Sequence, residues 1–248
     1  MILVSNDDGI NAQGIGVLTR LMCALADVVV VAPDGPRSGA ACSMTVTRPV
    51  TLSPISRTPG LTTVACSGTP ADCVKLALEH VVDRKPTLMV SGINHGDNAS
   101  VNVHYSGTMG AVFEACMKDI PAIGFSLRTR DTQCDFSPYE EAITRIAEHV
   151  LQNGLPQDTC LNVNFPQVER LAGLSVCRMA RGKWDTEWAP TEQQGTFRLT
   201  GRYTCLEPDA QDTDWWAMDH GRGAVVPLHL DMTHTPCLST LQSLNIEL

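Results

Sequence analysis

Residues 1–33 decide the fold, and they read MILVSNDDGINAQGIGVLTRLMCALADVVVVAP. The apolar run at 2–6 predicts a strand. The stretch at 14–26 then places Ile15, Leu18, Met22 and Leu25 at helical spacing. DVVVVAP is a continuous β-branched run, which is typical of a strand buried on both faces. Strand, helix and buried strand in this order form a βαβ unit, so we predict an α/β fold with a mostly parallel sheet.

The same alternation continues to Pro166. Thr69, Pro70 and Asp72 are helix-start signals, so Asp72 is read first as a capping residue. SMTVTRPVTL at 43–52 alternates and predicts an antiparallel excursion from the sheet. Further strands are predicted at 61–66, 87–92, 122–127 and 159–166, and helices at 68–83, 108–119 and 138–153.

Beyond Pro166 the alternation of strands and helices stops. Residues 167–235 are rich in Gly, Pro and Trp, and TFRLTGRYTCLEP at 196–208 resembles a hairpin. CLSTLQSLNIE at 237–247 predicts a helix that returns to the core. We therefore predict a catalytic α/β core at 1–166 and a β-rich extension at 167–248, which form one structural unit and use the extension for subunit contact.

The composition indicates a globular protein that does not bind nucleic-acid duplexes. Hydrophobic residues make up 43% of the 248 residues, and the net charge of −9 would repel a phosphate backbone. None of the ten cysteines forms a C-x-x-C pair, and several lie in apolar runs, such as Cys23 and Cys116. We expect reduced, buried thiols. With no basic leader before MILVSN and no membrane-length apolar run, we expect a cytoplasmic protein.

Polar residues follow the predicted parallel strands, where ligands bind in open sheets. Asn6-Asp7-Asp8-Gly9 follows the first strand and Asp34-Gly35-Pro36-Arg37-Ser38-Gly39 the second, while Asn94 to Asn98 and then Ser106-Gly107-Thr108 follow TLMVSG. These loops offer two carboxylates, a hydroxyl and an amide oxygen. An all-oxygen set suits Mg²⁺, Mn²⁺ or Ca²⁺ better than zinc. Backbone N–H groups in the glycine turn and at the helix start would favour a phosphate.

Each of these segments also has a simpler interpretation. Asp-Asp-Gly is more often a turn than a pair of ligands, and Ser106-Gly107-Thr108 by itself is a helix cap. Arg37 can be a solvated loop charge, and the loop histidines His95 and His104 are more often merely exposed. The co-location of the loops on one sheet edge, which the βαβ pattern predicts independently, favours a metal and phosphate site that would hydrolyse a phosphate ester.

Five separated motifs together resemble the survival protein E (SurE) family of nucleotidases. They are NDDG at 6–9, APDGPRSG at 32–39, GTPADC at 68–73, VSGINHGDN at 90–98 and YSGTMGA at 105–111. LNVNFP at 161–166 and PLHLDMT at 227–233 extend the resemblance towards the C-terminus. The motifs occur in the family's order over most of the chain, so together they are far more specific than any one of them.

The resemblance implies a Rossmann-like, three-layer domain whose C-terminal extension assembles a homodimer or homotetramer. It implies hydrolysis of nucleoside 5′-monophosphates, of 3′-monophosphates in some members and of short polyphosphate in others, with one divalent metal ion, Mg²⁺ or Mn²⁺, per subunit. Carried onto this chain, the metal ligands are Asp7, Asp8, Ser38 and Asn94, with Asp7 and Asp8 also the catalytic carboxylates. The phosphate contacts are Gly39, Asn98, Ser106, Gly107 and Thr108.

The chain departs from the family pattern outside these motifs. Arg222-Gly223 stands where an aromatic residue is usual, Ala115 follows Glu114 where a glycine is common, and residues 181–194 match no pattern. These departures bear on the base pocket and the assembly more than on the chemistry.

Other functional classes fit the sequence less well. A haloacid-dehalogenase-type phosphatase has Asp-x-Asp after its first strand, whereas these aspartates are adjacent. Gly9, Gly14 and Gly16 do not form the G-x-G-x-x-G of a nicotinamide dehydrogenase, and no P-loop motif occurs. A non-catalytic sensor that binds a metal or a nucleotide is the alternative that the sequence leaves open, and metal-dependent turnover separates it from an enzyme.

Overall fold

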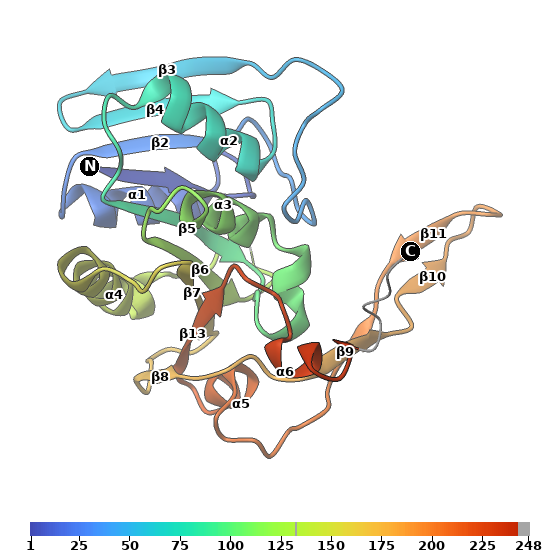
Figure 1. The fold of residues 1–248 in the computed structure, drawn as a ribbon. Helices are drawn as coiled ribbons and strands as arrows, with labels where there is room; N and C mark the ends of the chain where they lie inside the picture. Colours follow the sequence, from blue (N-terminus) through green and yellow to red (C-terminus); the bar gives the residue numbers. More distant parts are fainter. Residues whose placement is uncertain (132, 243–248) are drawn as a thin grey trace.

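The computed structural model describes residues 1–131 and 133–242, and its centre is a nine-stranded sheet (Figure 1). The strand order is β3-β4-β2-β1-β5-β6-β7-β13-β8. The strands that continue the predicted βαβ pattern are parallel to one another. They are β1 (Ile2–Ser5), β2 (Val28–Pro33), β4 (Leu61–Cys66), β5 (Leu88–His95), β6 (Ala122–Arg128) and β7 (Thr159–Pro166). The prediction of a mostly parallel sheet is confirmed.

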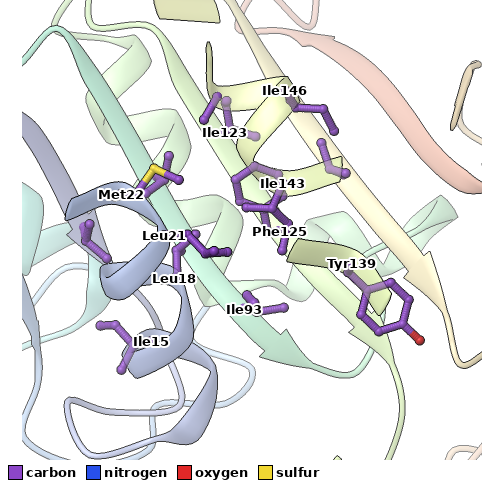
Figure 2. Packing of buried hydrophobic residues seen from close by; sticks show 14 of the residues in the cluster. Ile15, Leu18, Leu21, Met22, Ile93, Ile123, Phe125, Tyr139, Ile143 and Ile146 are labelled. Carbon is purple, nitrogen blue, oxygen red and sulfur yellow. The ribbon is translucent and has the colours of Figure 1, made fainter. Parts of the chain in front are cut away.

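Helices cover both faces of this sheet, which gives three layers. α1 (Gln13–Cys23) and α4 (Glu140–Asn153) pack on one face, where Figure 2 shows their apolar residues against Ile123 and Phe125 of β6. α2 (Pro70–Leu76) and α3 (Gly107–Cys116) pack on the other face. Successive strand residues alternate between the layers, with Ile2 in the first cluster and Leu3 in the second. The central strands are therefore buried on both sides, as their continuous apolar runs predict.

The antiparallel excursion exists, but the prediction placed it too early. Residues 43–51 form no strand, and β3 (Leu52–Thr58) pairs antiparallel with β4 at the edge of the sheet. Individual hydrogen bonds hold the segment before β3 against the rest of the protein. In one of them, the backbone N–H of Thr45 donates to the Asp72 carboxylate. Pro49 in this stretch has no N–H for a strand ladder.

The helix predicted at 68–83 begins as expected at the Thr69 cap, but its α-helical part ends at Leu76. A short π-helical turn, Ala77–Val81, follows it. Two short 3₁₀ segments, η2 (Ser100–Tyr105) and η3 (Ser137–Tyr139), precede α3 and α4.

The sheet continues beyond Pro166. β13 (Gly223–His229) pairs antiparallel with β7, and β8 (Leu174–Val176) pairs parallel with β13. A short helix, α5 (Asp214–Asp219), which the sequence pattern did not predict, begins at the side-chain cap of Thr213.

TFRLTGRYTCLEP does not fold back on itself as predicted. It is one arm of a longer antiparallel ribbon, in which β12 (Arg202–Cys205) pairs with β9 (Gly182–Asp185) and β11 (Phe197–Leu199) pairs with β10 (Trp188–Pro190). The turn lies at 191–196, where Thr191 and Thr196 bond to each other through their backbones. The ribbon tip projects away from the sheet (Figure 1).

The predicted C-terminal helix is only partly described. The structure has α6 at Thr235–Leu238, slightly earlier than expected, and residues 243–247 of the prediction lie outside the described residues. No disulfide joins any of the ten cysteines, all of which are among the described residues. Cys116 is buried as expected, but Cys23 is exposed near the end of α1, so that part of the prediction is wrong. None of the helices within 1–131 and 133–242 combines the length and apolarity needed to span a membrane.

Candidate functional site

Asp7 and Asp8 lie in a turn directly after β1, at the carboxyl edge of the parallel sheet. The strand ends at Ser5, so the two side chains are free of the strict alternation of a strand. The Asn6 side chain closes the turn, because its Nδ2 donates to the Gly9 carbonyl oxygen at 2.9 Å and its Oδ1 accepts from the Gly9 N–H at 3.2 Å. The turn gives the adjacent carboxylates two different surroundings.

Asp7 is buried under the start of α3, with 5% of its surface exposed. The Thr108 hydroxyl donates to Asp7 Oδ1 at 2.5 Å. A Cβ on Gly107 would lie 2.8 Å from the Asp7 Cβ, so only glycine allows this close approach. Burial is the main cause that raises the pKa of Asp7 to about 6, and the charge of Asp8 acts in the same direction against the Thr108 hydrogen bond.

Asp8 faces His95, at the other side of the turn. Asp8 Oδ2 accepts the backbone N–H of His95 at 3.1 Å and lies 3.2 Å from His95 Nδ1. The imidazole packs edge-on against Phe136, and its Nε2 is buried without a hydrogen-bond partner in the part of the chain that the structure describes. His104, the other histidine considered, is exposed on η2.

The loop after β2 carries Ser38 and Gly39, both exposed. Its position is fixed next to Asp7, because the backbone N–H of Arg37 donates to the Asp7 carbonyl oxygen at 2.7 Å. Four residues after Arg37, the Ala41 N–H donates to the Tyr105 carbonyl oxygen at 3.3 Å. Within the described residues the Ser38 hydroxyl makes no hydrogen bond to Asp7, Asp8 or Asn94, although its loop is anchored to the same turn.

Arg37 is not the solvated charge that a loop position suggests. Its guanidinium pairs with Asp34 at 2.7 Å and also reaches the carbonyl oxygens of Ser67 and Gly68. These bonds connect the loops that follow β2 and β4. Arg37 therefore holds the shape of the loop that presents Ser38.

Asn94 belongs to β5 and not to the loop after it, because the strand continues to His95. The pairing of β5 with β6 shifts register between Ser91 and Asn94, which sets the end of β5 apart from the regular ladder. Asn94 Nδ2 donates to the Gly96 carbonyl oxygen at 2.7 Å. With the nitrogen engaged in this way, Oδ1 is the atom left to meet a cation.

Asn98 lies deeper than a simple loop contact, among other buried amides. Its backbone N–H donates to Asn164 Oδ1 at 2.7 Å, its carbonyl oxygen accepts from Asn162 Nδ2 at 2.9 Å, and its own Nδ2 donates to Ser126 Oγ at 2.7 Å. Asn162 and Asn164 come from LNVNFP. Two asparagines at a spacing of two in a buried strand are the sequence signal that could have identified them.

Ser106, Gly107 and Thr108 form the N-terminus of α3. Ser106 Oγ accepts the Met109 N–H at 3.0 Å, so the predicted helix cap is present. The N–H of Gly107 has no acceptor in the chain as described, as is usual for the first helical turn, whereas the backbone N–H of Thr108 faces the Asp7 carboxylate and acts to lower its pKa. Both donors lie beside Asp7 at the positive end of the helix dipole.

The residues present fit a hard divalent cation. Two carboxylates lie side by side, one of them buried with a raised pKa, and a nearby cation would favour the charged form of both. Asn94 offers an amide oxygen at the same edge, and Ser38 a hydroxyl on the anchored loop. The described residues contain no group of three or more His, Cys, Asp and Glu side chains that could hold a metal. Besides the two carboxylates, any ion here would therefore need neutral oxygen ligands, which Mg²⁺ and Mn²⁺ accept.

The candidate site is an assembly of loops at the carboxyl edge of the sheet. Two cavities of about 350 and 510 Å³ lie at the opposite, amino-terminal edge of the sheet, lined in part by Val82, Asp83 and Arg84. Neither of them contains a residue of the candidate site. The features that mark the site are therefore its two carboxylates and the N-terminus of α3 beside them.

Comparison with known proteins agrees with the fold and with the motifs. A family model described as survival protein SurE matches residues 2–186. The 5′-nucleotidase SurE of Bacteroides thetaiotaomicron is 50% identical over 236 residues, which cover 94% of this chain and 91% of the relative. The 5′-nucleotidase SurE of Bacteroides fragilis is 47% identical, with coverage of 98% and 96%.

A solved structure is similar over the same length. The crystal structure of the SurE protein from Aquifex aeolicus superimposes with a TM-score of 0.85 at 34% identity, and the match covers 99% of each chain. The three-layer fold and its C-terminal additions are thus shared over nearly the whole length. By its motifs, its sequence relatives and its fold, the chain belongs to the survival protein SurE family.

Proposed function

We propose that this protein is a divalent-metal-dependent phosphomonoesterase that hydrolyses nucleoside 5′-monophosphates to nucleoside and phosphate. The observation that carries the proposal is the meeting of the Asp7-Asp8 pair with the N-terminus of α3, where the N–H of Gly107 is free, at one edge of the sheet. The relatives named 5′-nucleotidase SurE support the substrate class.

Asp7, Asp8, Ser38 and Asn94 are the residues we propose to hold one Mg²⁺ or Mn²⁺ ion. When bound, such an ion supplies Lewis-acid activation of the phosphate ester and of a water molecule. The chain's own contribution is to keep the ligands in place. Thr108 orients Asp7, His95 orients Asp8, and Gly96 orients the Asn94 amide.

The phosphate would lie on the N-terminus of α3. Gly107 and Thr108 are the first contacts we propose, because the free N–H of Gly107 can donate to a phosphate oxygen and the helix dipole favours the negative charge. Gly39, Ser106 and Asn98 are the further contacts we propose, from the loop after β2, the helix cap and the turn after β5.

Of the two carboxylates, Asp8 is the better placed to accept a proton from an attacking water. One oxygen of each carboxylate is taken by a protein donor, but Asp7 is buried under α3 with 5% exposed, whereas the Asp8 side chain is 20% exposed. The His95 Nε2 is buried against protein, so His95 acts as a partner of Asp8 and not as a donor to the leaving oxygen.

We further propose that the extension at 167–248 assembles a homodimer or homotetramer around the core at 1–166. In the β10–β11 part of the ribbon, Trp188 pairs with Leu199 and Pro190 with Phe197, so all four side chains lie on one face. Trp188, Phe197 and Leu199 are 63, 61 and 61% exposed. An apolar face of this kind on a projecting two-stranded ribbon is suited to contact a second subunit.

Phosphate release tests the function. The metal-stripped protein is assayed with 5′- and 3′-nucleoside monophosphates, a short polyphosphate and an aryl phosphate, before and after Mg²⁺ or Mn²⁺ is restored. We expect turnover of 5′-monophosphates only with metal. Tight binding of nucleotide without release under any metal would overturn the enzymatic proposal and favour a sensor.

A further inference from the structure

Three buried polar side chains of β6 and β7 form hydrogen bonds with Asn98. Asn162, Asn164 and Ser126 are fully buried, and Asn98 is 5% exposed. Asn162 and Asn164 are two residues apart on β7 and therefore point to the same face, while Ser126 is the β6 neighbour of Asn164 in the sheet register. Buried amides in the middle of a sheet are costly unless every polar atom is satisfied.

The hydrogen bonds run in a closed, directional ring. The Asn98 backbone N–H can only donate, and its bond to Asn164 at 2.7 Å therefore identifies the Asn164 acceptor as Oδ1. Asn164 Nδ2 then donates to Asn162 Oδ1 at 2.9 Å, and Asn162 Nδ2 donates to the Asn98 carbonyl oxygen at 2.9 Å. The ring fixes the orientation of both amides without ambiguity.

Within the ring, each amide oxygen and nitrogen of Asn162 and Asn164 already has a protein partner. Both side chains are also fully buried, so they do not reach a substrate directly. The ring binds the Asn98 backbone on both sides of its Cα, through its N–H and its carbonyl oxygen. Ser126 Oγ accepts one N–H of the Asn98 side chain. The second N–H of that amide is left to meet a ligand.

We propose that Asn162 and Asn164, with Ser126, are positioning residues that place the Asn98 side chain for its contact with the substrate phosphate. The inference rests on the proposed function, in which Asn98 is a phosphate contact. It explains why LNVNFP carries two polar residues in the core of the sheet. It also makes β7, two strands from β5 in the sheet order, part of the phosphate site.

A double-mutant cycle tests this inference. In Asn164→Asp the oxygen that accepts from Asn98 remains, but the donor to Asn162 becomes a second acceptor, so the ring breaks at constant volume. If Asn164 acts through the Asn98 side chain, Asn164→Asp raises KM about tenfold, the loss expected for one good hydrogen bond, in the wild-type background. In the Asn98→Ala background the same change raises KM less than about twofold, because the placed side chain is gone.

A merely structural role gives a different result. With a merely structural role, Asn164→Asp would lower Tm and change KM by the same factor in both backgrounds, and this result would overturn the proposal. A folded Asn164→Asp variant with unchanged KM would overturn it as well. If Asn164→Asp does not fold, the same cycle is run with Ser126→Ala, which removes only the hydroxyl that holds the Asn98 amide. Ser91→Ala is the matched control, because Ser91 is equally buried but its hydroxyl has no partner in the residues described, and its KM should equal that of the wild type.

Failure of the proposed function is separable from failure of this inference. If the wild-type protein releases no phosphate with any metal, the function is wrong. The cycle is then repeated with the Kd for a nucleoside 5′-monophosphate, measured by calorimetry in the presence of Mn²⁺. The same non-additivity in Kd supports the positioning role, and additivity contradicts it.

Discussion

The adjacent residues Asp7 and Asp8 have different surroundings because their hydrogen-bond partners differ. Asp7 is covered by α3 and accepts from the Thr108 hydroxyl, so burial raises its pKa to about 6. Asp8 is half-buried and faces the backbone and ring of His95. A single turn thus provides two oriented carboxylates, of which Asp7 is the more buried and Asp8 the more accessible. In our account both hold the ion, and Asp8 is the one that can accept a proton.

A substitution at Gly107 tests whether the close approach of α3 to Asp7 is needed for activity. An added Cβ would lie 2.8 Å from the Asp7 Cβ, so either the carboxylate or the helix start must move. Misplacement by about 1 Å can cost about 100-fold in rate, so we expect Gly107→Ala to lower kcat/KM by about that factor. The measurement is steady-state phosphate release from a 5′-monophosphate.

Gly16→Ala is the matched control for this substitution. A Cβ at Gly16, in the middle of α1, would have no atom within 4 Å. Alanine there should leave kcat/KM unchanged and stabilise the fold by up to about 1 kcal/mol, since glycine disfavours a helix. A Gly107→Ala enzyme as active as the wild type would contradict the proposed contact between α3 and Asp7.

At the scale of elements, α2 shows how a local signal and a distant contact combine. Thr69 and Asp72 form the capping box that the sequence predicts, with the Thr69 N–H donating to Asp72 Oδ2 at 2.9 Å. Asp72 also accepts the backbone N–H of Thr45 at 3.1 Å, from the irregular segment before β3. One carboxylate therefore caps a helix and anchors a loop.

We expect Asp72→Asn to lower the free energy of unfolding by about 1–3 kcal/mol at pH 7, the range for a lost cap and a lost bond to a charged group. Burial raises the pKa of the Asp72 carboxyl, but the hydrogen bonds from Thr45 and Thr69 outweigh it and hold the folded-state pKa below its ordinary value of 3.8. A depressed pKa means that the unfolded chain binds the proton more tightly. The stability from Asp72 is therefore present above pH 3.8 and is lost as the pH falls through the folded-state pKa.

Urea unfolding at pH 7 and at pH 3 measures this effect. The difference between wild type and Asp72→Asn should shrink at the lower pH, whereas the exposed control Asp83→Asn should be near wild type at both. A difference that grows at pH 3 would show that the charged carboxylate is not what stabilises α2.

The elements that the sequence predicts well are those specified by local chemistry. The βαβ start, the cap at Thr69 and the cap at Ser106 all depend on residues within a few positions of each other. β13 was missed because its place beside β7 is a long-range pairing, and Pro227 weakens its strand signal. The ribbon was misread because Thr200 and Gly201 resemble a hairpin turn, whereas the Thr200 N–H bonds back to Glu187 across the ribbon.

The candidate site divides in the same way. The co-location of the turn after β1, the loop after β2 and the start of α3 follows from the parallel sheet and was predictable. The partners of each side chain were not. Asn98 meets Asn164, which is 66 residues away, and Asp8 meets His95, which is 87 residues away. Such pairs depend on register and on side-chain packing, which a single sequence does not reveal.

At the scale of the whole molecule, the ribbon tip exposes a cluster of apolar side chains. It projects from the body of the protein (Figure 1), and its apolar face consists of Trp188, Pro190, Phe197 and Leu199. Two strands alone cannot shield these apolar side chains from water. We therefore expect the wild-type protein to be an oligomer at micromolar concentration.

Lysine at two of these positions should weaken the assembly. In Trp188→Lys/Leu199→Lys two charges would replace a cross-strand apolar pair, so the mass measured by light scattering should fall to that of a smaller species. Met117→Lys is the control, because Met117 is also exposed but lies at the end of α3, away from the ribbon. A wild-type monomer, or a variant of unchanged mass, would contradict the role of the ribbon.

The most direct test of the account is a metal titration of phosphate release from one 5′-monophosphate. The metal-stripped wild type, Asp8→Asn and the exposed control Asp83→Asn, at the opposite edge of the sheet, are titrated side by side with Mn²⁺. The account predicts that Mn²⁺ restores turnover in the wild type and in Asp83→Asn, while Asp8→Asn falls by about 100-fold or more. Full turnover in the stripped protein, or in Asp8→Asn, would contradict the claim that the turn after β1 forms a metal-dependent phosphatase site.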